Sequence, residues 1–199
     1  PNFAHGGAGV GYFLADLYQE TKNTAYLEAA VSAANYVKSR AVQQSEGFLV
    51  CHTEEQQPPT TFYLGVCHGP AGTGRFMYLL NKITGDNSYL QWIKDNFSGL
   101  KSTGAPETRS KGLWQNHGQC CGDAGIGDYA LFLYHATGDT DYLDYAKRTA
   151  AHVVGNAESA NGLSWQMAEH RSQPKFLEQQ TGYMQGAAGI GSFLLHLAS

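Results

Sequence analysis

The sequence predicts an all-α fold built from repeated helical hairpins, and three observations support this prediction. The pattern G-x-A-G-x-G occurs four times along the 199 residues, and long-period repeats of this kind are typical of repeat architectures. Each copy leads into apolar residues spaced at i, i+3 and i+4, as one face of a helix requires. After each of the first three helices, turn residues and a second helical pattern follow.

The first helix of each repeat begins at its glycine signature. The four signatures are "HGGAGVG" (5–11), "HGPAGTG" (68–74), "CGDAGIG" (121–127) and "QGAAGIG" (185–191). Small residues on the first turns allow neighbouring helices to approach closely, so we expect these inner helices to converge on one axis. Glycine-rich phosphate-binding loops need a preceding strand in a βαβ unit, and this helical context argues against nucleotide binding.

A second, outer helix is predicted in the first three repeats, over residues 24–41, 87–100 and 140–154. The sequence "TGD" at 84–86 and 137–139 predicts a helix that ends at a left-handed glycine, with Asp capping the next helix. Each outer helix carries a Tyr-Leu pair in its first turn. Irregular connectors with aromatic and β-branched residues follow the outer helices, and we expect short extended pieces there.

Composition restricts the class of protein. Hydrophobic residues make up 42% of the chain and charged residues 15%, which differs from a disordered composition. The net charge of −4 and the lack of a basic stripe argue against a nucleic-acid partner. We expect no membrane span, since no apolar run approaches about 20 residues. Because no signal peptide opens the chain, we expect a cytoplasmic protein whose four cysteines are free thiols or metal ligands.

The residues just before each signature are the strongest candidates for chemistry. Aligned on the first glycine, the repeats place these side chains at one end of the inner helices: His5, Cys67, His68, Cys120, Cys121 and Gln185. Thiolates that converge in this way suit Zn²⁺, and three protein ligands leave a fourth position for water or substrate. We therefore predict a zinc site formed by Cys67, Cys120 and Cys121, with His5 and His68 as titratable groups near it.

Other cysteine and histidine residues are weaker candidates. Cys51 and His52 form a second potential ligand pair in a connector. The connector residues His52, His117 and His170 are interpreted as rim or packing residues. The remaining histidines fall inside the helical patterns and are interpreted as core or surface residues: His135, His152 and His196.

At these positions the chain resembles the lanthionine synthetase C family, the cyclases of lanthipeptide biosynthesis and their eukaryotic relatives. "FAHGGAG" (3–9) is similar to the family's G-x-x-H-G element, with Phe3 in place of its leading Gly. "GVCHGPAG" (65–72) is similar to W-C-H-G-A-P-G, with Val66 in place of Trp. "QCCGDAG" (119–125) is similar to C-H-G-x-A-G, with Cys121 where that element has His, as in members that bind zinc through three cysteines. "GYMQGAAGIGSFLLHL" resembles the final repeat.

The resemblance implies an (α/α) toroid of seven inner and seven outer helices, on a chain about twice as long. Four inner and three outer helices correspond to its C-terminal half. We therefore expect residues 1–199 to be a single domain of this family or a C-terminal fragment of one. The missing N-terminal half, or a dehydratase domain of a larger synthetase, is then an expected partner. The family's upstream Asp would precede residue 1, and Tyr63 stands where some members carry Arg.

The activity that the resemblance implies is addition of a peptide cysteine thiol to dehydroalanine or dehydrobutyrine, which forms a thioether ring. The expected substrate is a dehydrated precursor peptide or another thiol, and the expected cofactor is Zn²⁺. Three thiolate ligands would donate electron density and keep the bound substrate sulfur nucleophilic. By its match to the family histidine, His5 is the expected acid, with His68 as second choice.

Three alternatives stay open at the level of sequence. One is a non-cyclising zinc protein of the same family that binds glutathione or a partner protein. Another is a carbohydrate-active (α/α) toroid enzyme, which needs paired carboxylates in the cavity. The acidic residues nearest to the signatures and connectors for that role are Asp123, Asp128 and Glu169. The third is a purely structural helical array, which the clustered cysteines disfavour.

Overall fold

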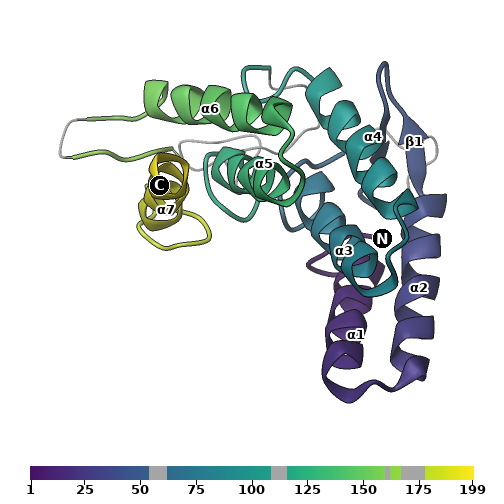
Figure 1. Cartoon of the computed structure of the whole chain (residues 1–199). Helices are drawn as coiled ribbons and strands as arrows, with labels where there is room; N and C mark the ends of the chain where they lie inside the picture. The colour runs from purple at the N-terminus through teal and green to yellow at the C-terminus, as the bar shows by residue number, and fades with distance from the viewer. Residues whose placement is uncertain (54–61, 109–115, 160–161, 167–177) are drawn as a thin grey trace. The chain divides into compact units, whose positions relative to one another are not determined.

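The computed structural model describes residues 1–53, 62–108, 116–159, 162–166 and 178–199. Within these ranges the chain forms seven α-helices and one two-stranded antiparallel sheet (Figure 1), as the all-α prediction requires. The chain divides into two compact units, residues 1–113 and 114–199. None of the helices in the described part is both long and apolar enough to cross a membrane.

The inner helices begin at the predicted signatures. They are α1 (Gly7–Thr21), α3 (Pro70–Thr84), α5 (Asp123–Thr137) and α7 (Ala187–Ala198). In each of them the first glycine of the signature is the N-cap residue, in an extended conformation. A Cβ atom at Gly69 would collide with the backbone of Tyr63 and Leu64, and one at Gly122 with that of Asn116. The glycine therefore allows the preceding loop to fold back over the helix start.

The outer helices are α2 (Thr24–Ser39), α4 (Ser88–Ser102) and α6 (Thr140–Gly155). As predicted, α3 and α5 end at the left-handed glycines Gly85 and Gly138, whose φ angles are 72° and 75°. In the first hairpin Lys22 takes this conformation instead, with φ 58°. Asp139 caps α6 by accepting a hydrogen bond from the Asp141 amide. Asp86 likewise accepts a hydrogen bond from the Ser88 amide, but the N-cap residue of α4 is Asn87 and not the predicted Asp86.

The first unit contains two hairpins, α1–α2 and α3–α4, with α1 packed against α3. The connector after α2 forms a small hairpin of β1 (Ala41–Gln43) and β2 (Phe48–Val50), which packs on α4. The Phe48 ring lies 5.1 Å from that of Trp92, centroid to centroid. The Asn96 amide donates a hydrogen bond to the Phe48 carbonyl. The extended pieces expected in this connector are therefore present.

The second unit contains the α5–α6 hairpin, with α7 packed against both helices. Gly127 of α5 lies directly beneath the ring of Phe193 of α7, and that phenylalanine is fully buried. In the first unit Gly11 of α1 lies in the same way beneath the buried ring of Phe76 of α3. Small residues therefore do bring neighbouring inner helices close together, with an aromatic ring filling the space.

Candidate functional site

The loop that leads into α5 carries the two adjacent cysteines. The Asp123 amide donates to the Asn116 carbonyl at 2.9 Å, and the Cys120 amide donates to the Met184 carbonyl at 2.9 Å. These bonds fix the backbone on both sides of the pair. Cys121 is buried and Cys120 is half-buried, and their sulfur atoms lie 3.4 Å apart. The start of α5 therefore presents two sulfur atoms side by side.

The spacing of these sulfurs suits a shared metal ion better than a disulfide. A disulfide would need an S–S distance of about 2.05 Å, and none of the four cysteines is joined to another in this way. Two thiolates on one tetrahedral zinc, with bonds of about 2.3 Å, lie roughly 3.8 Å apart. A small side-chain adjustment from 3.4 Å reaches that value. The Cys120–Cys121 pair thus fits two of the ligands predicted for zinc.

Cys67 holds the equivalent place in the first unit, in the loop that leads into α3. Its side chain is buried, and its carbonyl accepts a hydrogen bond from the Ala4 amide at 2.8 Å. This bond ties the loop before α1 to the loop before α3. Because Cys67 belongs to the first unit and the cysteine pair to the second, a shared centre stays a prediction.

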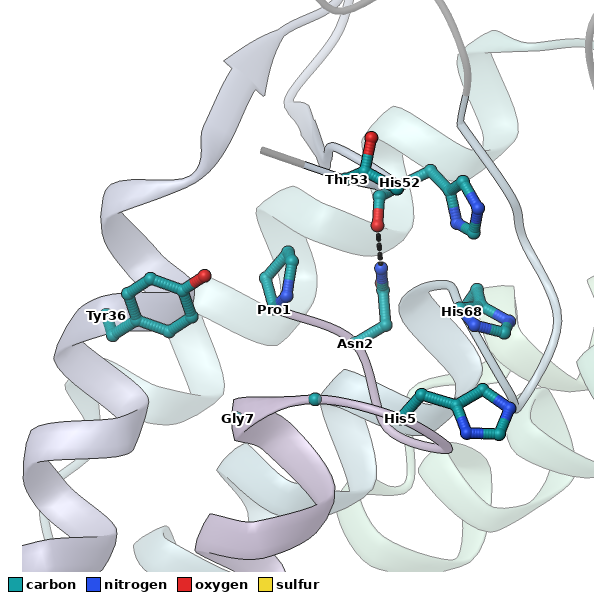
Figure 2. A pocket seen from close by; sticks show the side chains of 9 residues that line it. Pro1, Asn2, His5, Gly7, Tyr36, His52, Thr53 and His68 are labelled. Atoms are coloured by element: carbon teal, nitrogen blue, oxygen red, sulfur yellow. Dashed lines mark hydrogen bonds between the residues drawn. The ribbon is translucent and has the colours of Figure 1, made fainter. Parts of the chain in front are cut away.

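The same backbone bond brings His5 and His68 together, with their ring centroids 5.4 Å apart. Both line a cavity of about 450 Å³ in the first unit, which Figure 2 shows from close by. His5 is exposed and also borders a second, more apolar cavity of about 690 Å³. Two imidazole side chains therefore stand at one accessible cavity.

His52 also lines the first cavity, although the sequence indicated only a rim or packing role. Its ring lies 4.3 Å from the Tyr63 ring and 4.8 Å from the His68 ring, centroid to centroid. The buried Asn2 amide donates to the carbonyls of Cys51 and His52, the latter at 2.7 Å (Figure 2). Asn2 thus holds the connector against the cavity. No sequence pattern distinguished Asn2, because its partners lie about fifty residues away.

The other weak candidates have separate surroundings. Cys51 is buried at the end of β2, and neither it nor His52 belongs to a set of three close metal-binding side chains among the described residues. His196 contacts the Asp128 carboxylate at 3.1 Å. Glu169 and His170 lie outside the described residues.

A buried polar cluster in the second unit combines residues that the sequence did not connect. His117 contacts the Asp123 carboxylate at 2.8 Å, and His152 of α6 lies 4.0 Å from the same oxygen. The sequence indicated a rim or packing role for His117 and a core or surface position for His152. Their meeting depends on how α6 packs against α5, which no local pattern specifies.

The helical hairpins, glycine signatures and cysteine pair define the class, and comparison of the sequence with protein families agrees. The chain belongs to the lanthionine synthetase C-like family, whose sequence model matches residues 2–199. No curated protein sequence matches the chain significantly.

Solved structures show the same architecture. Nisin cyclase superposes with a TM-score of 0.64 at 14% identity, covering 99% of this chain and 45% of its own. The Lin0763 protein of Listeria innocua gives 0.58 at 18% identity, covering 96% and 53%. An inactive variant of an α-1,6-mannanase of Salegentibacter, in complex with α-1,6-mannotetrose, gives 0.51 at 17% identity, covering 96% and 56%. The chain thus consists of helical hairpins that match about half of the (α/α) toroid proteins nisin cyclase and the mannanase, and it spans about half the length of these structures.

Proposed function

We propose that this chain is the zinc-binding part of a cyclase that forms thioether rings in a dehydrated precursor peptide. The observation that carries the proposal is the pair of cysteine sulfurs, 3.4 Å apart at the start of α5 and not joined by a disulfide, in a chain of the lanthionine synthetase C-like family. The similarity of its fold to that of nisin cyclase also supports this proposal.

In this proposal the zinc ligands are Cys67, Cys120 and Cys121. Cys67 precedes its signature glycine by two residues, as Cys120 precedes Gly122, so the two repeats offer their sulfurs from equivalent positions. When bound, zinc would lower the pKa of a substrate thiol and hold it as a thiolate. Three thiolate donors are the soft ligand set that zinc accepts.

His5 and His68 supply the proton transfer. As the substrate sulfur bonds to the β-carbon of the dehydro residue, the electron pair of the double bond moves towards the carbonyl and leaves an enolate. Protonation at the α-carbon completes the thioether. His5 is exposed at the cavity and can reach a bound peptide. His68, 5.4 Å away centroid to centroid, is placed to replenish the proton.

The test is a cyclisation assay with the zinc-loaded chain and a peptide that contains one dehydroalanine and one cysteine. Ring formation leaves the mass unchanged but removes a free thiol, so alkylation followed by mass spectrometry counts the product. We expect the thiol to disappear with the wild-type chain and to persist with Cys121→Ala. Replacing the general acid in His5→Ala should slow the reaction by about 10²–10⁴-fold with zinc retained.

The matched control is His135→Ala, which removes an exposed histidine of α5 and should cyclise at the wild-type rate. Loss of the thiol at the same rate with wild-type chain and with buffer would contradict the proposal. If the peptide thiol persists but glutathione binds the zinc-loaded chain, the chain is instead a non-cyclising zinc protein that binds glutathione.

A further inference from the structure

We propose that the second unit contains a second divalent-cation site, formed by His117, Asp123 and His152. The proposal does not depend on the cysteine centre, because none of its ligands is a cysteine. All three residues lie in one compact unit. One ligand atom from each lies within 4.8 Å of the other two.

Three different elements supply the ligands. His117 lies in the loop before α5, Asp123 is the first residue of α5, and His152 lies in the last turn of α6. The loop is held in place because the Ala124 amide donates to the His117 carbonyl. Helix packing between α5 and α6 brings His152 over the start of α5. The cluster therefore lies where the start of α5 meets the end of α6, opposite the turn that joins the two helices.

The carboxylate is the centre of the cluster. Asp123 is fully buried, and one of its oxygens, Oδ2, faces both imidazoles. Nδ1 of His117 is 2.8 Å from this oxygen, and Nε2 of His152 is 4.0 Å from it. A buried carboxylate needs a counter-charge or strong hydrogen bonds. A divalent cation held by the three groups would supply that charge, with the two imidazoles as neutral ligands.

The donor set is one that first-row metals accept. Two imidazole nitrogens and one carboxylate oxygen suit zinc and the neighbouring divalent transition metals. Around a tetrahedral ion with bonds of about 2.0 Å, ligand atoms lie roughly 3.3 Å apart. The distances of 2.8 Å and 4.0 Å bracket this value, and the three ligand atoms all lie within 4.8 Å of one another, so side-chain adjustments would place them around a common ion.

Solvent access also suits a ligand role for His152. The His152 side chain is 16% exposed, which leaves a route from solvent to the cluster. The amide nitrogen of Asn156 lies 3.4 Å from Nε2 of His152. A metal ion bound at Nε2 would take the place of this contact.

The site would fix the loop that carries the cysteine pair. Asp123 follows Cys121 by two residues, and His117 precedes Cys120 by three. A cation that joins both residues to α6 would anchor this loop at its two ends. The site is therefore expected to stabilise the folded unit even where the cysteines are replaced.

The test measures metal binding by the full chain with Zn²⁺ and Co²⁺ as probes. His152→Ala removes the ligand that is least buried, so the fold should survive. We expect elemental analysis to show one fewer Zn²⁺ per chain in this variant than in wild type. His152→Asp restores a ligand and should recover the ion. His135→Ala, an exposed histidine of the same hairpin, should keep the full complement.

Cobalt separates this site from the cysteine centre. Thiolate ligation gives an intense near-ultraviolet charge-transfer band, whereas histidine and carboxylate ligation does not. We expect His152→Ala to lose one Co²⁺ and keep that band. Absence of the band in the wild-type chain would contradict only the cysteine centre. Equal metal content in folded wild type and His152→Ala, checked by circular dichroism, would overturn the second site.

Discussion

The sulfur atoms of Cys120 and Cys121 lie 3.4 Å apart on neighbouring residues of a loop whose backbone is bonded at both ends. Two thiols held so closely repel each other when both ionise, unless a cation lies between them. The start of α5 adds the positive end of a helix dipole, which favours thiolates. The loop therefore already holds two of the proposed metal ligands close together without the third.

The first prediction concerns zinc content. We expect Cys120→Ala and Cys121→Ala each to weaken zinc binding strongly, because each removes a thiolate from the centre. Cys51→Ala is the matched control, since Cys51 is a buried cysteine of the other unit. Competition with a chromogenic chelator measures the affinities. Unchanged affinity in both variants would remove the cysteine pair from the site.

The second prediction tests the third ligand. If Cys67 completes the centre, Cys67→Ala should lower zinc affinity as much as Cys121→Ala does, although the two cysteines belong to different units. Cobalt spectra should show fewer thiolate bonds, through a weaker charge-transfer band for each bound ion. A variant with the wild-type band intensity and affinity would show that the pair binds metal without Cys67.

The sequence indicated the helices well because their signals are local. The signature glycines fix where inner helices begin, and Gly85 and Gly138 fix where two of them end. The sequence did not indicate that α1 ends at Lys22 in the left-handed conformation, because glycine is the usual residue for that conformation. The helix boundaries could therefore be predicted from residues a few positions apart. The exception is Lys22, which adopts a positive φ that is unfavourable for a non-glycine residue.

The surroundings of the candidate sites were less predictable because they depend on tertiary packing. Alignment of the repeats placed His5 and His68 at equivalent helix ends, and the structure brings their rings together. His152 carries no such mark, because it lies in the last turn of an outer helix among alanines and valines. Only the packing of α6 on α5 reveals its approach to Asp123.

The third prediction compares two glycines at the same place in the signature. A Cβ at Gly127 would meet the buried ring of Phe193, whereas a Cβ at Gly191 meets no atom within 4 Å. Gly127→Ala should therefore destabilise the fold by about 1–3 kcal/mol through overpacking. Gly191→Ala should be neutral or stabilise by roughly 0.5–1 kcal/mol, as alanine favours a helix. Urea unfolding measures both, and equal effects would refute the close packing of α5 and α7.

The fourth prediction concerns alkaline pH. Burial of Tyr142, helped by the charges of Asp139 and Asp141, raises its pKa to about 12. In the unfolded chain a tyrosine ionises near pH 10. The folded state therefore favours the neutral phenol. The resulting contribution to the free energy of unfolding is fully present below about pH 10 and is lost as the pH rises towards 12.

We expect the free energy of unfolding to fall on the order of 2 kcal/mol more in wild type than in Tyr142→Phe between about pH 9 and pH 12. Taking the difference between the two chains cancels the lysines and other tyrosines that titrate in this range. Tyr183→Phe is the control, because Tyr183 is 50% exposed and this variant also removes one tyrosine hydroxyl. Urea unfolding at each pH gives the values. Parallel curves for wild type and Tyr142→Phe would mean that the phenol ionises as easily in the folded chain as in the unfolded one.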